Sequence, residues 1–253
     1  MTTISLVNKK ALITGGGTGI GRAIAIAFAK LGAEVVINYN SSQNDAENTV
    51  AEIEKIGGRA IAVQADLTRE EQVINLLQGA EKFTGGQIDI LVNNAGTMVK
   101  KCLIEEMDLE LWQKVLDVNM TSTFLVTKHV IPMMKEQQGG KIINISSLAA
   151  HTGGSIGATA YATSKAAVQA FTKGLAKELA PILVNCIAPG IITTRFHEMY
   201  TSPEVRNQFH RNIPLGREGT PEETAGAAVF LATDLGNYVT GETVEVNGGL
   251  LMD

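Results

Sequence analysis

Residues 10–21 read KALITGGGTGIG, a short apolar run that leads directly into a cluster of glycines. An amphipathic pattern typical of a helix follows, from Arg22 to Leu31. In this order, glycines let the backbone turn sharply and approach a pyrophosphate, while the helix N-terminus supplies N–H groups and a positive dipole. The stretch therefore predicts the opening strand, turn and helix of a nucleotide-binding fold. A flexible glycine turn with no ligand is the alternative interpretation.

Further β-rich runs alternate with helical patterns, which is typical of βαβ units and a parallel sheet. The expected strands cover residues 11–13, 34–38, 60–63, 90–92, 141–145, 183–187 and 243–246. The expected helices lie near residues 20–31, 43–56, 69–83, 108–136, 160–180 and 221–232. Several strands are continuous apolar runs, as expected where helices cover both faces of a sheet. The pattern predicts an α/β protein with a doubly wound (Rossmann) fold, in which seven parallel strands are flanked by helices.

Composition is consistent with one domain over residues 1–253, because a chain of this length with 45% apolar residues can bury one large core. A net charge of −5 without clustered Lys and Arg argues against a nucleic-acid surface. No run approaches the roughly 18 apolar residues of a membrane span, and no secretion signal is visible, so we expect a cytoplasmic protein. Cys102 and Cys186 are far apart and offer no metal site, which suits a reducing compartment.

The segment Tyr161-Ala-Thr-Ser-Lys165 places a phenol and an ammonium four residues apart in a helical pattern. Side chains at that spacing project from the same face of a helix. A free tyrosine has a pKa of about 10, and a neighbouring cation lowers it by stabilising the phenolate. Such a tyrosine could exchange a proton with a substrate oxygen near neutral pH. Surface helices also carry such pairs by chance, so the segment gains weight only from other motifs.

Several motifs in one order make the chain resemble the short-chain dehydrogenase/reductase family, in its single-domain form. They are Thr14 to Gly21 at the start, Asn93-Asn94-Ala95-Gly96 after the fourth strand, Ser147, and Tyr161 with Lys165. The resemblance covers nearly the whole chain. It implies an enzyme that uses NAD(P)(H) to interconvert a carbonyl and a secondary alcohol, with hydride transfer at carbon balanced by proton transfer at oxygen.

The resemblance also implies catalytic roles. Tyr161 is the general acid or base, and Lys165 lowers its pKa and holds the nicotinamide ribose. Ser147 hydrogen-bonds the substrate oxygen, with Ser146 as its structural neighbour; the reverse assignment of the two serines stays open. Asn119 positions a water in a proton relay, although a helical Asn can instead bond its own helix.

Residues at the strand ends are expected to bind the cofactor, because ligands of open α/β sheets lie beyond the carboxyl ends of the strands. By resemblance they are Gly15, Thr18, Gly19, Ile20, Gly21, Tyr39, Asn40, Ser41, Ser42, Asp66, Leu67, Asn93, Ala95, Gly96, Tyr161, Lys165, Pro189, Gly190, Ile192 and Thr194. For Asp66 the alternative is a helix cap, and for Ile192 and Thr194 an ordinary turn.

The choice of cofactor depends on Tyr39, which stands where an NAD-binding relative would carry an acid for the ribose 2′-hydroxyl. No carboxylate at this position would repel a 2′-phosphate, and Asn40, Ser41 and Ser42 could donate hydrogen bonds to it. NADP(H) is therefore favoured over NAD(H), with dual use open, although the Arg or Lys often found in NADP-binding relatives is missing.

Residues 191–220 fit no strand and are expected to form a substrate lid. Within them, Arg195 and His197 are candidate contacts for a carboxylate, which favours a small polar substrate such as a keto sugar or keto sugar acid. A solvated loop of mixed charge is the alternative for these residues. No metal is expected.

Other functions and partners stay open. One rival is a 3-oxoacyl-[acyl-carrier-protein] reductase, with Lys177 as a docking residue, although Ile131-Pro132 stands where a second basic residue would be expected. A dinucleotide-sensing binding protein and a scaffold are rivals of another class. By resemblance, the chain is expected to assemble as a homotetramer or homodimer.

Overall fold

The computed structural model describes residues 4–200, 206 and 211–252, and the side chains of residues 197 and 198 lie outside this description. The strands are β1 (Lys10–Ile13), β2 (Glu34–Tyr39), β3 (Arg59–Gln64), β4 (Ile90–Asn93), β5 (Lys141–Ile145), β6 (Leu183–Pro189) and β7 (Thr243–Val246). The helices are α1 (Gly19–Lys30), α2 (Gln43–Lys55), α3 (Glu70–Thr84), α4 (Leu109–Leu116), α5 (Ser122–Glu136), α6 (Ala149–Thr152), α7 (Thr159–Glu178), α8 (Arg195–Tyr200) and α10 (Pro221–Ala232). A π-helical turn (Asp117–Thr121) joins α4 to α5, and short 3-10 helices cover Ile104–Glu106 and Asp234–Gly236.

The seven strands form one parallel sheet in the order β3-β2-β1-β4-β5-β6-β7, which confirms the predicted fold class. Leu12 of β1 pairs with Val36 of β2 on one side and Leu91 of β4 on the other. The direction in which strands are added reverses between β1 and β4. Such a switch point opens a crevice beyond the carboxyl ends of the strands, which is where open α/β sheets bind ligands.

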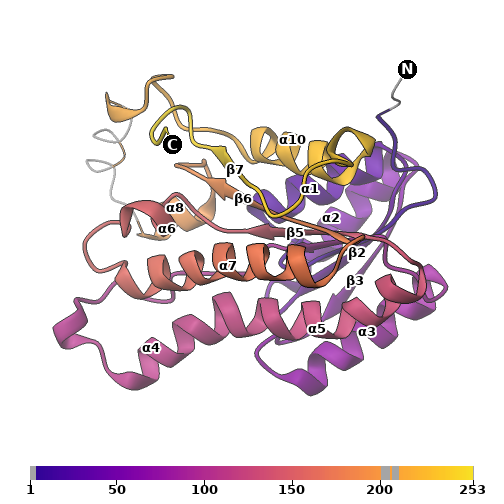
Figure 1. Cartoon of the computed structure of the whole chain (residues 1–253), viewed down its shortest axis with the longest axis horizontal. Coiled ribbons are helices and arrows are strands. Elements are labelled where there is room, and N and C mark those ends of the chain that lie inside the picture. Colours follow the sequence, from indigo (N-terminus) through magenta and orange to yellow (C-terminus); the bar gives the residue numbers. More distant parts are fainter. Residues whose placement is uncertain (1–3, 201–205, 207–210, 253) are drawn as a thin grey trace.

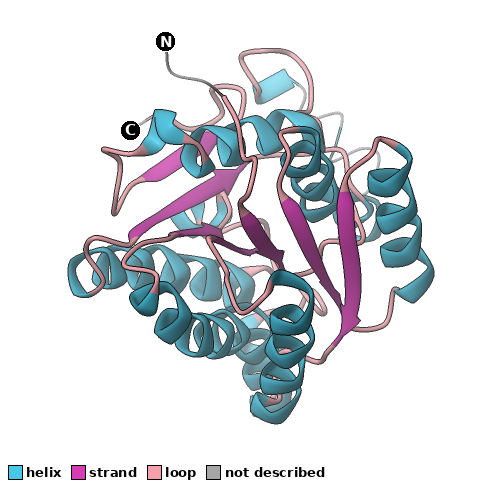
Figure 2. Ribbon diagram, turned by 90° about the vertical axis from the view of Figure 1, so that its right-hand side faces the viewer, coloured by secondary structure: helices cyan, strands magenta, loops and turns pink. Residues whose placement is uncertain are grey.

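Helices cover both faces of the sheet (Figures 1 and 2). Successive side chains of a strand point to opposite faces, so Ile13 and Leu12 belong to different apolar clusters. The Ile13 cluster packs against Phe28 of α1 and residues of α2 and α10. The Leu12 cluster packs against Leu76 of α3 and residues of α5 and α7. Burial on both faces explains the continuous apolar runs of the strand sequences.

The predicted long helix over residues 108–136 is interrupted, which is the main departure from the sequence expectation. The π-helical turn lies between α4 and α5, and Asn119 is at its centre and fully buried. Local side chains bond the backbone there: Ser122 Oγ donates to the Val118 carbonyl, and Thr123 Oγ1 donates to the Asn119 carbonyl. Single π-helical turns inside α-helices often mark functional sites.

The predicted lid segment is not wholly irregular, because it contains α8. Ile192 and Gly219 form an isolated parallel bridge that brings the two ends of this segment together. None of the helices in the described ranges is long and apolar enough to cross a membrane.

Candidate active site

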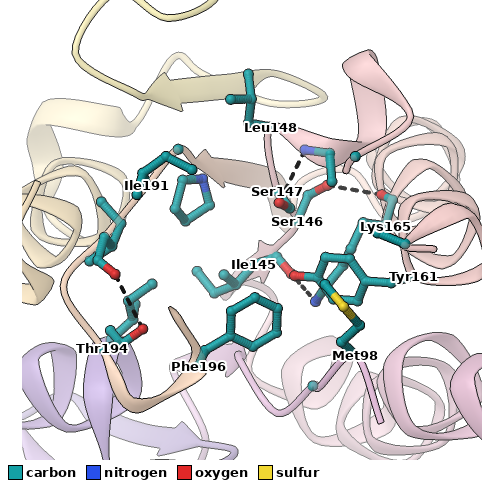
Figure 3. Close-up of a pocket in the computed structure, with 18 of the residues that line it drawn as sticks. Met98, Ile145, Ser146, Ser147, Leu148, Tyr161, Lys165, Ile191, Thr194 and Phe196 are labelled. Carbon is teal, nitrogen blue, oxygen red and sulfur yellow. Dashed lines mark hydrogen bonds between the residues drawn. The ribbon is translucent and has the colours of Figure 1, made fainter. Parts of the chain in front are cut away.

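A cavity of about 550 Å³ lies at the carboxyl ends of the central strands. The segments after β1, β4, β5 and β6 all contribute to its wall, together with α7 and α8. Predicted site residues in the wall are Gly15, Thr18, Gly19, Ile20, Ala95, Gly96, Ser147, Tyr161, Lys165, Pro189, Gly190, Ile192, Thr194 and Arg195. Figure 3 shows the part of this wall around Tyr161 and Thr194. The fold thus brings distant motifs of the chain into one site.

Several positions of the glycine turn favour glycine, either because of the backbone conformation or because a side chain would collide. Gly15 and Gly19 have positive φ angles of 61° and 53°, in the left-handed region that favours glycine. A Cβ on Gly21 would stand 2.4 Å from the Gly15 carbonyl oxygen. The turn leads into the N-terminus of α1, a helix of 12 residues. A bare backbone at a helix N-terminus fits a phosphate group, so this cradle is suited to the diphosphate of a dinucleotide.

Polar side chains that were not among the predicted site residues hold the glycine turn in place. Asn94 Nδ2 donates to the carbonyls of Thr14 (2.9 Å) and Gly15 (3.1 Å). Thr14 Oγ1 in turn accepts from the backbone N–H groups of Asn94 and Ala95. On the other side, the Gly15 N–H donates to Asn38 Oδ1 over 3.4 Å. The sequence signal for Asn38 was a polar residue inside an apolar strand.

Tyr161 and Lys165 lie on the first turns of α7 and face the cavity together. Lys165 Nζ is 5.9 Å from the centroid of the Tyr161 ring and donates to the Ile145 carbonyl over 2.8 Å. The two neighbouring serines differ. Ser146 is buried and its Oγ donates to the Lys165 carbonyl, whereas Ser147 Oγ accepts from the Ala149 N–H. Ser146 thus fastens α7 to β5, while Ser147 remains beside the phenol.

Burial dominates the acid–base properties of this pair. It raises the pKa of Tyr161 to about 12, and the hydrogen bond with Ser147 offsets part of this rise. It also lowers the pKa of Lys165 to about 8. The pKa of Tyr161 is therefore raised in this structure, where the sequence predicted a lowered value, because burial disfavours the charged phenolate. Stabilisation of the phenolate by Lys165 stays a prediction.

Asn119 is bonded entirely to backbone groups. Its Oδ1 accepts from the Thr97 N–H (3.0 Å), and its Nδ2 donates to the carbonyls of Thr97 and Val115 (both 2.8 Å). Gly96 lies between this amide and the catalytic candidates, since a Cβ there would be 2.6 Å from Asn119 Oδ1 and 3.0 Å from Lys165 Nζ. The π-helical turn therefore aligns the loop after β4 with α7.

Helix α8 covers the tyrosine. The Phe196 ring lies 5.5 Å from that of Tyr161, and 5.1 Å from that of Tyr200. The Tyr200 hydroxyl is 3.1 Å from Thr97 Oγ1. Arg195, a predicted substrate contact, lines the cavity and forms an ion pair with Asp45 of α2. The side chain of His197, the other predicted contact, lies outside the described residues.

Some predicted cofactor residues are not in the cavity wall as described. The segment from Tyr39 to Ser42, which includes Asn40 and Ser41, connects β2 to α2 and does not line the cavity. Asp66 Oδ1 accepts from the N–H and hydroxyl of Thr68, so it forms a turn before α3 and does not cap that helix, whose N-cap is Arg69. Leu67 is buried in the apolar core, and Asn93 donates to Thr127 and Asn144. Leu67 and Asn93 therefore contact the protein interior, and cofactor binding by them stays a prediction.

The two cysteines are free, with Cys186 buried and Cys102 half-buried. Within the described ranges, no group of three or more His, Cys, Asp or Glu residues is arranged to hold a metal ion.

Known proteins resemble this chain over nearly its whole length. Residues 15–251 match the family model described as Enoyl-(Acyl carrier protein) reductase. A 3-oxoacyl-[acyl-carrier-protein] reductase of Synechocystis sp. is 45% identical over 98% of this chain and 99% of its own length. Glucose 1-dehydrogenase 2 of Bacillus subtilis is 40% identical over 98% of this chain and 96% of its own length.

A solved structure of a 7α-hydroxysteroid dehydrogenase, complexed with NADH and 7-oxo glycochenodeoxycholic acid, superposes with a TM-score of 0.92. It is 36% identical, and the match covers 97% of this chain and 95% of that one. The sequence identity, the shared fold and the cavity at the sheet's switch point all indicate the same family. The chain belongs to the short-chain dehydrogenase/reductase family and is an oxidoreductase that acts on CH–OH or carbonyl groups.

Proposed function

We propose that the protein reduces the 3-oxo group of an acyl thioester to a secondary alcohol, at the expense of NADPH or NADH. The observation that carries this proposal is the apolar part of the cavity wall, which is formed by Met98, Leu148, Ile191, Phe196 and Leu250. Such a wall suits an acyl chain, whereas a keto sugar would need polar partners for each hydroxyl group. The name of the Synechocystis relative supports the same substrate class.

The residues of this chain suit a coenzyme in the cavity. The glycine turn and the N-terminus of α1 would hold the diphosphate, and Lys165 would hold the nicotinamide ribose. Ile192 and Thr194, which lie beside the turn after β6, would hold the carboxamide. The bound coenzyme would supply the hydride.

Tyr161 would donate the proton to the carbonyl oxygen as that oxygen gains negative charge. Because the pKa of Tyr161 is raised to about 12, the phenol is protonated at neutral pH, as an acid in carbonyl reduction must be. Ser147 would donate a hydrogen bond to the same oxygen, and a well-placed donor of this kind contributes about 3 kcal/mol to transition-state stabilisation. Asn119 would act as a positioning residue, since its amide holds Thr97 in place.

For the coenzyme we propose a preference for NADPH over NADH, with use of both. Tyr39 at the end of β2 carries no charge that would repel a 2′-phosphate, and Ser41 and Ser42 follow it with hydroxyl donors. If catalytic efficiency with NADH is substantial and none is found with NADPH, the preference is wrong.

A keto sugar or keto sugar acid is the second candidate substrate. Thr152, Ser155 and Asn212 bring polar groups to the cavity wall, Lys101 brings a charge, and the Bacillus relative is named for a sugar. Assays of the purified protein with acetoacetyl-CoA and with a panel of keto sugars, each with both coenzymes, separate the two. We expect kcat/KM to be highest for the thioester; turnover of keto sugars alone would refute the proposed substrate class.

A further inference from the structure

An ion pair joins α8 to α2 beside the glycine turn. Arg195 Nη1 lies 2.7 Å from Asp45 Oδ2, and Nη2 lies 3.1 Å from Oδ1, so the contact is bidentate. Arg195 is the first residue of α8, and Asp45 is in the first turn of α2. The two residues are 150 positions apart in the chain, so only the fold brings them together.

The neighbours of this pair contact the turn from both sides. A Cβ on Gly17 would stand 3.0 Å from the backbone nitrogen of Ala46, the residue after Asp45. A Cβ on Gly19 would stand 3.4 Å from Cγ2 of Thr194, the residue before Arg195. The tip of the turn, the start of α2, the ion pair and the start of α8 therefore form a closed ring.

The ring lies where a diphosphate would bind. Arg195 lines the same cavity as Thr18, Gly19 and Ile20, which form the N-terminus of α1. The Arg195 side chain is 67% exposed and that of Asp45 is 30% exposed, so the ion pair is open to water. Ion pairs that are open to water change the equilibrium between the closed and the open arrangement by about fivefold at most. The ring can therefore open readily.

The same helix reaches the catalytic tyrosine. Phe196 follows Arg195 directly, and its ring packs 5.5 Å from that of Tyr161. Movement of the N-terminal end of α8 away from α2 would therefore also uncover Tyr161. Just before α8, Thr193 Oγ1 donates to Glu218 Oε2. This bond anchors the chain at Thr193, so α8 can pivot about that residue.

We propose that Arg195 and Asp45 form a gate across the coenzyme's diphosphate site, which must open each time a coenzyme enters or leaves. The gate rests on the proposed function only in requiring that the cavity holds a dinucleotide. It gives Arg195 a role other than the substrate contact expected from the sequence. Asp45, which the sequence did not single out, becomes its positioning partner.

Stopped-flow measurement of NADPH and NADH binding to the full-length protein, followed by coenzyme fluorescence, tests the gate. The variants are Asp45→Asn, Arg195→Gln and the double variant. Because the pair must break for passage in either direction, each single variant should raise both the association and the dissociation rate constants, by about two- to fivefold. Kd should change by less than about twofold for both coenzymes, and the double variant should add nothing further.

Arg217→Gln is the matched control, since Arg217 forms an exposed ion pair with Glu223 and does not line the cavity. Its rate constants should equal those of the wild type. Unchanged rates in Asp45→Asn would overturn the gate. A faster dissociation in Arg195→Gln alone would also overturn it, because that result indicates a direct contact with coenzyme. Failure of the wild type to bind either coenzyme would instead refute the proposed function, and the gate with it.

Discussion

Lys165 places an ammonium group in the protein interior, where it is only 4% exposed. Its ammonium group donates a hydrogen bond to the backbone carbonyl of Ile145. The cost of this burial is visible in the pKa, which falls from 10.5 to about 8. Such a shift means that the charged lysine is less stable in the folded protein than in the unfolded chain at neutral pH. Lys165 therefore destabilises the folded protein, although its charge is placed at the candidate active site.

Replacement of Lys165 by Met should therefore abolish turnover and stabilise the protein. The pKa shift corresponds to a destabilisation of roughly 3 kcal/mol, which the substitution removes. The substitution also leaves the Ile145 carbonyl without a donor, which costs about 1–2 kcal/mol of stability. The folded-state pKa is below the unfolded value, so folding is penalised below pH 8, and the penalty disappears as pH rises from about 8 to 10.5.

Urea unfolding of both proteins across this pH range checks the prediction. The advantage of Lys165→Met should be about 1–2 kcal/mol at pH 7, and it should disappear and reverse as the penalty on the charged lysine is lost toward pH 10.5. A variant that is less stable at pH 7, or a difference that does not depend on pH, would show that the buried charge is not penalised.

At the scale of elements, the loop after β4, the π-helical turn and α7 meet at Gly96. A side chain there would collide with Asn119 Oδ1 and Lys165 Nζ. We expect Gly96→Ala to destabilise the protein by about 1–3 kcal/mol, as overpacked sites do, and to lower kcat through displacement of Lys165.

Gly226 is the control for this substitution, because it lies in α10 with nothing within 4 Å of its Cβ position. Ala at that position should be neutral or stabilise the helix by up to about 1 kcal/mol. Thermal unfolding and steady-state kinetics measure both effects. Equal stability and equal kcat of the two alanine variants would contradict the prediction that a side chain at position 96 collides with Asn119 and Lys165.

Periodicity and turn residues were enough to predict these elements to within about two residues at the strand ends. They did not predict the π-helical turn, because Asn119 bonds its own helix and also a loop distant in sequence, and only the folded chain brings that loop to it. The candidate site was likewise only partly predictable from the sequence. The motif residues Tyr161 and Ser147 were expected to share a site, and they do, but nothing local in the sequence pairs Arg195 with Asp45. Burial, which raises the pKa of Tyr161, is likewise a property of the folded chain.

At the scale of the whole molecule, α4 and α5 lie on the side of the sheet opposite α1 and α10 (Figure 1). Both helices carry exposed apolar side chains. Leu109 of α4 is 78% exposed and Phe124 of α5 is 42% exposed. Exposed apolar side chains on neighbouring helices are available for contact with another subunit. We therefore propose that copies of this chain assemble through α4 and α5 as a homodimer or homotetramer.

Light scattering should give two or four times the chain mass of 26.9 kDa. Phe124→Glu should shift the mass toward that of one chain, because it places a charge in the apolar contact. Ile56→Glu is the control, since Ile56 is exposed at the end of α2, away from these helices. A monomeric wild type would contradict the proposed assembly.

The account depends most on proton transfer from Tyr161 to a substrate beside bound coenzyme. Its most direct test compares Tyr161→Phe with Tyr238→Phe, a control at a fully exposed tyrosine, in kcat and in the Kd for NADPH. Loss of a general acid should lower kcat by about 10²- to 10⁴-fold in Tyr161→Phe, with the Kd nearly unchanged. Turnover in Tyr161→Phe equal to that of the control would contradict the account.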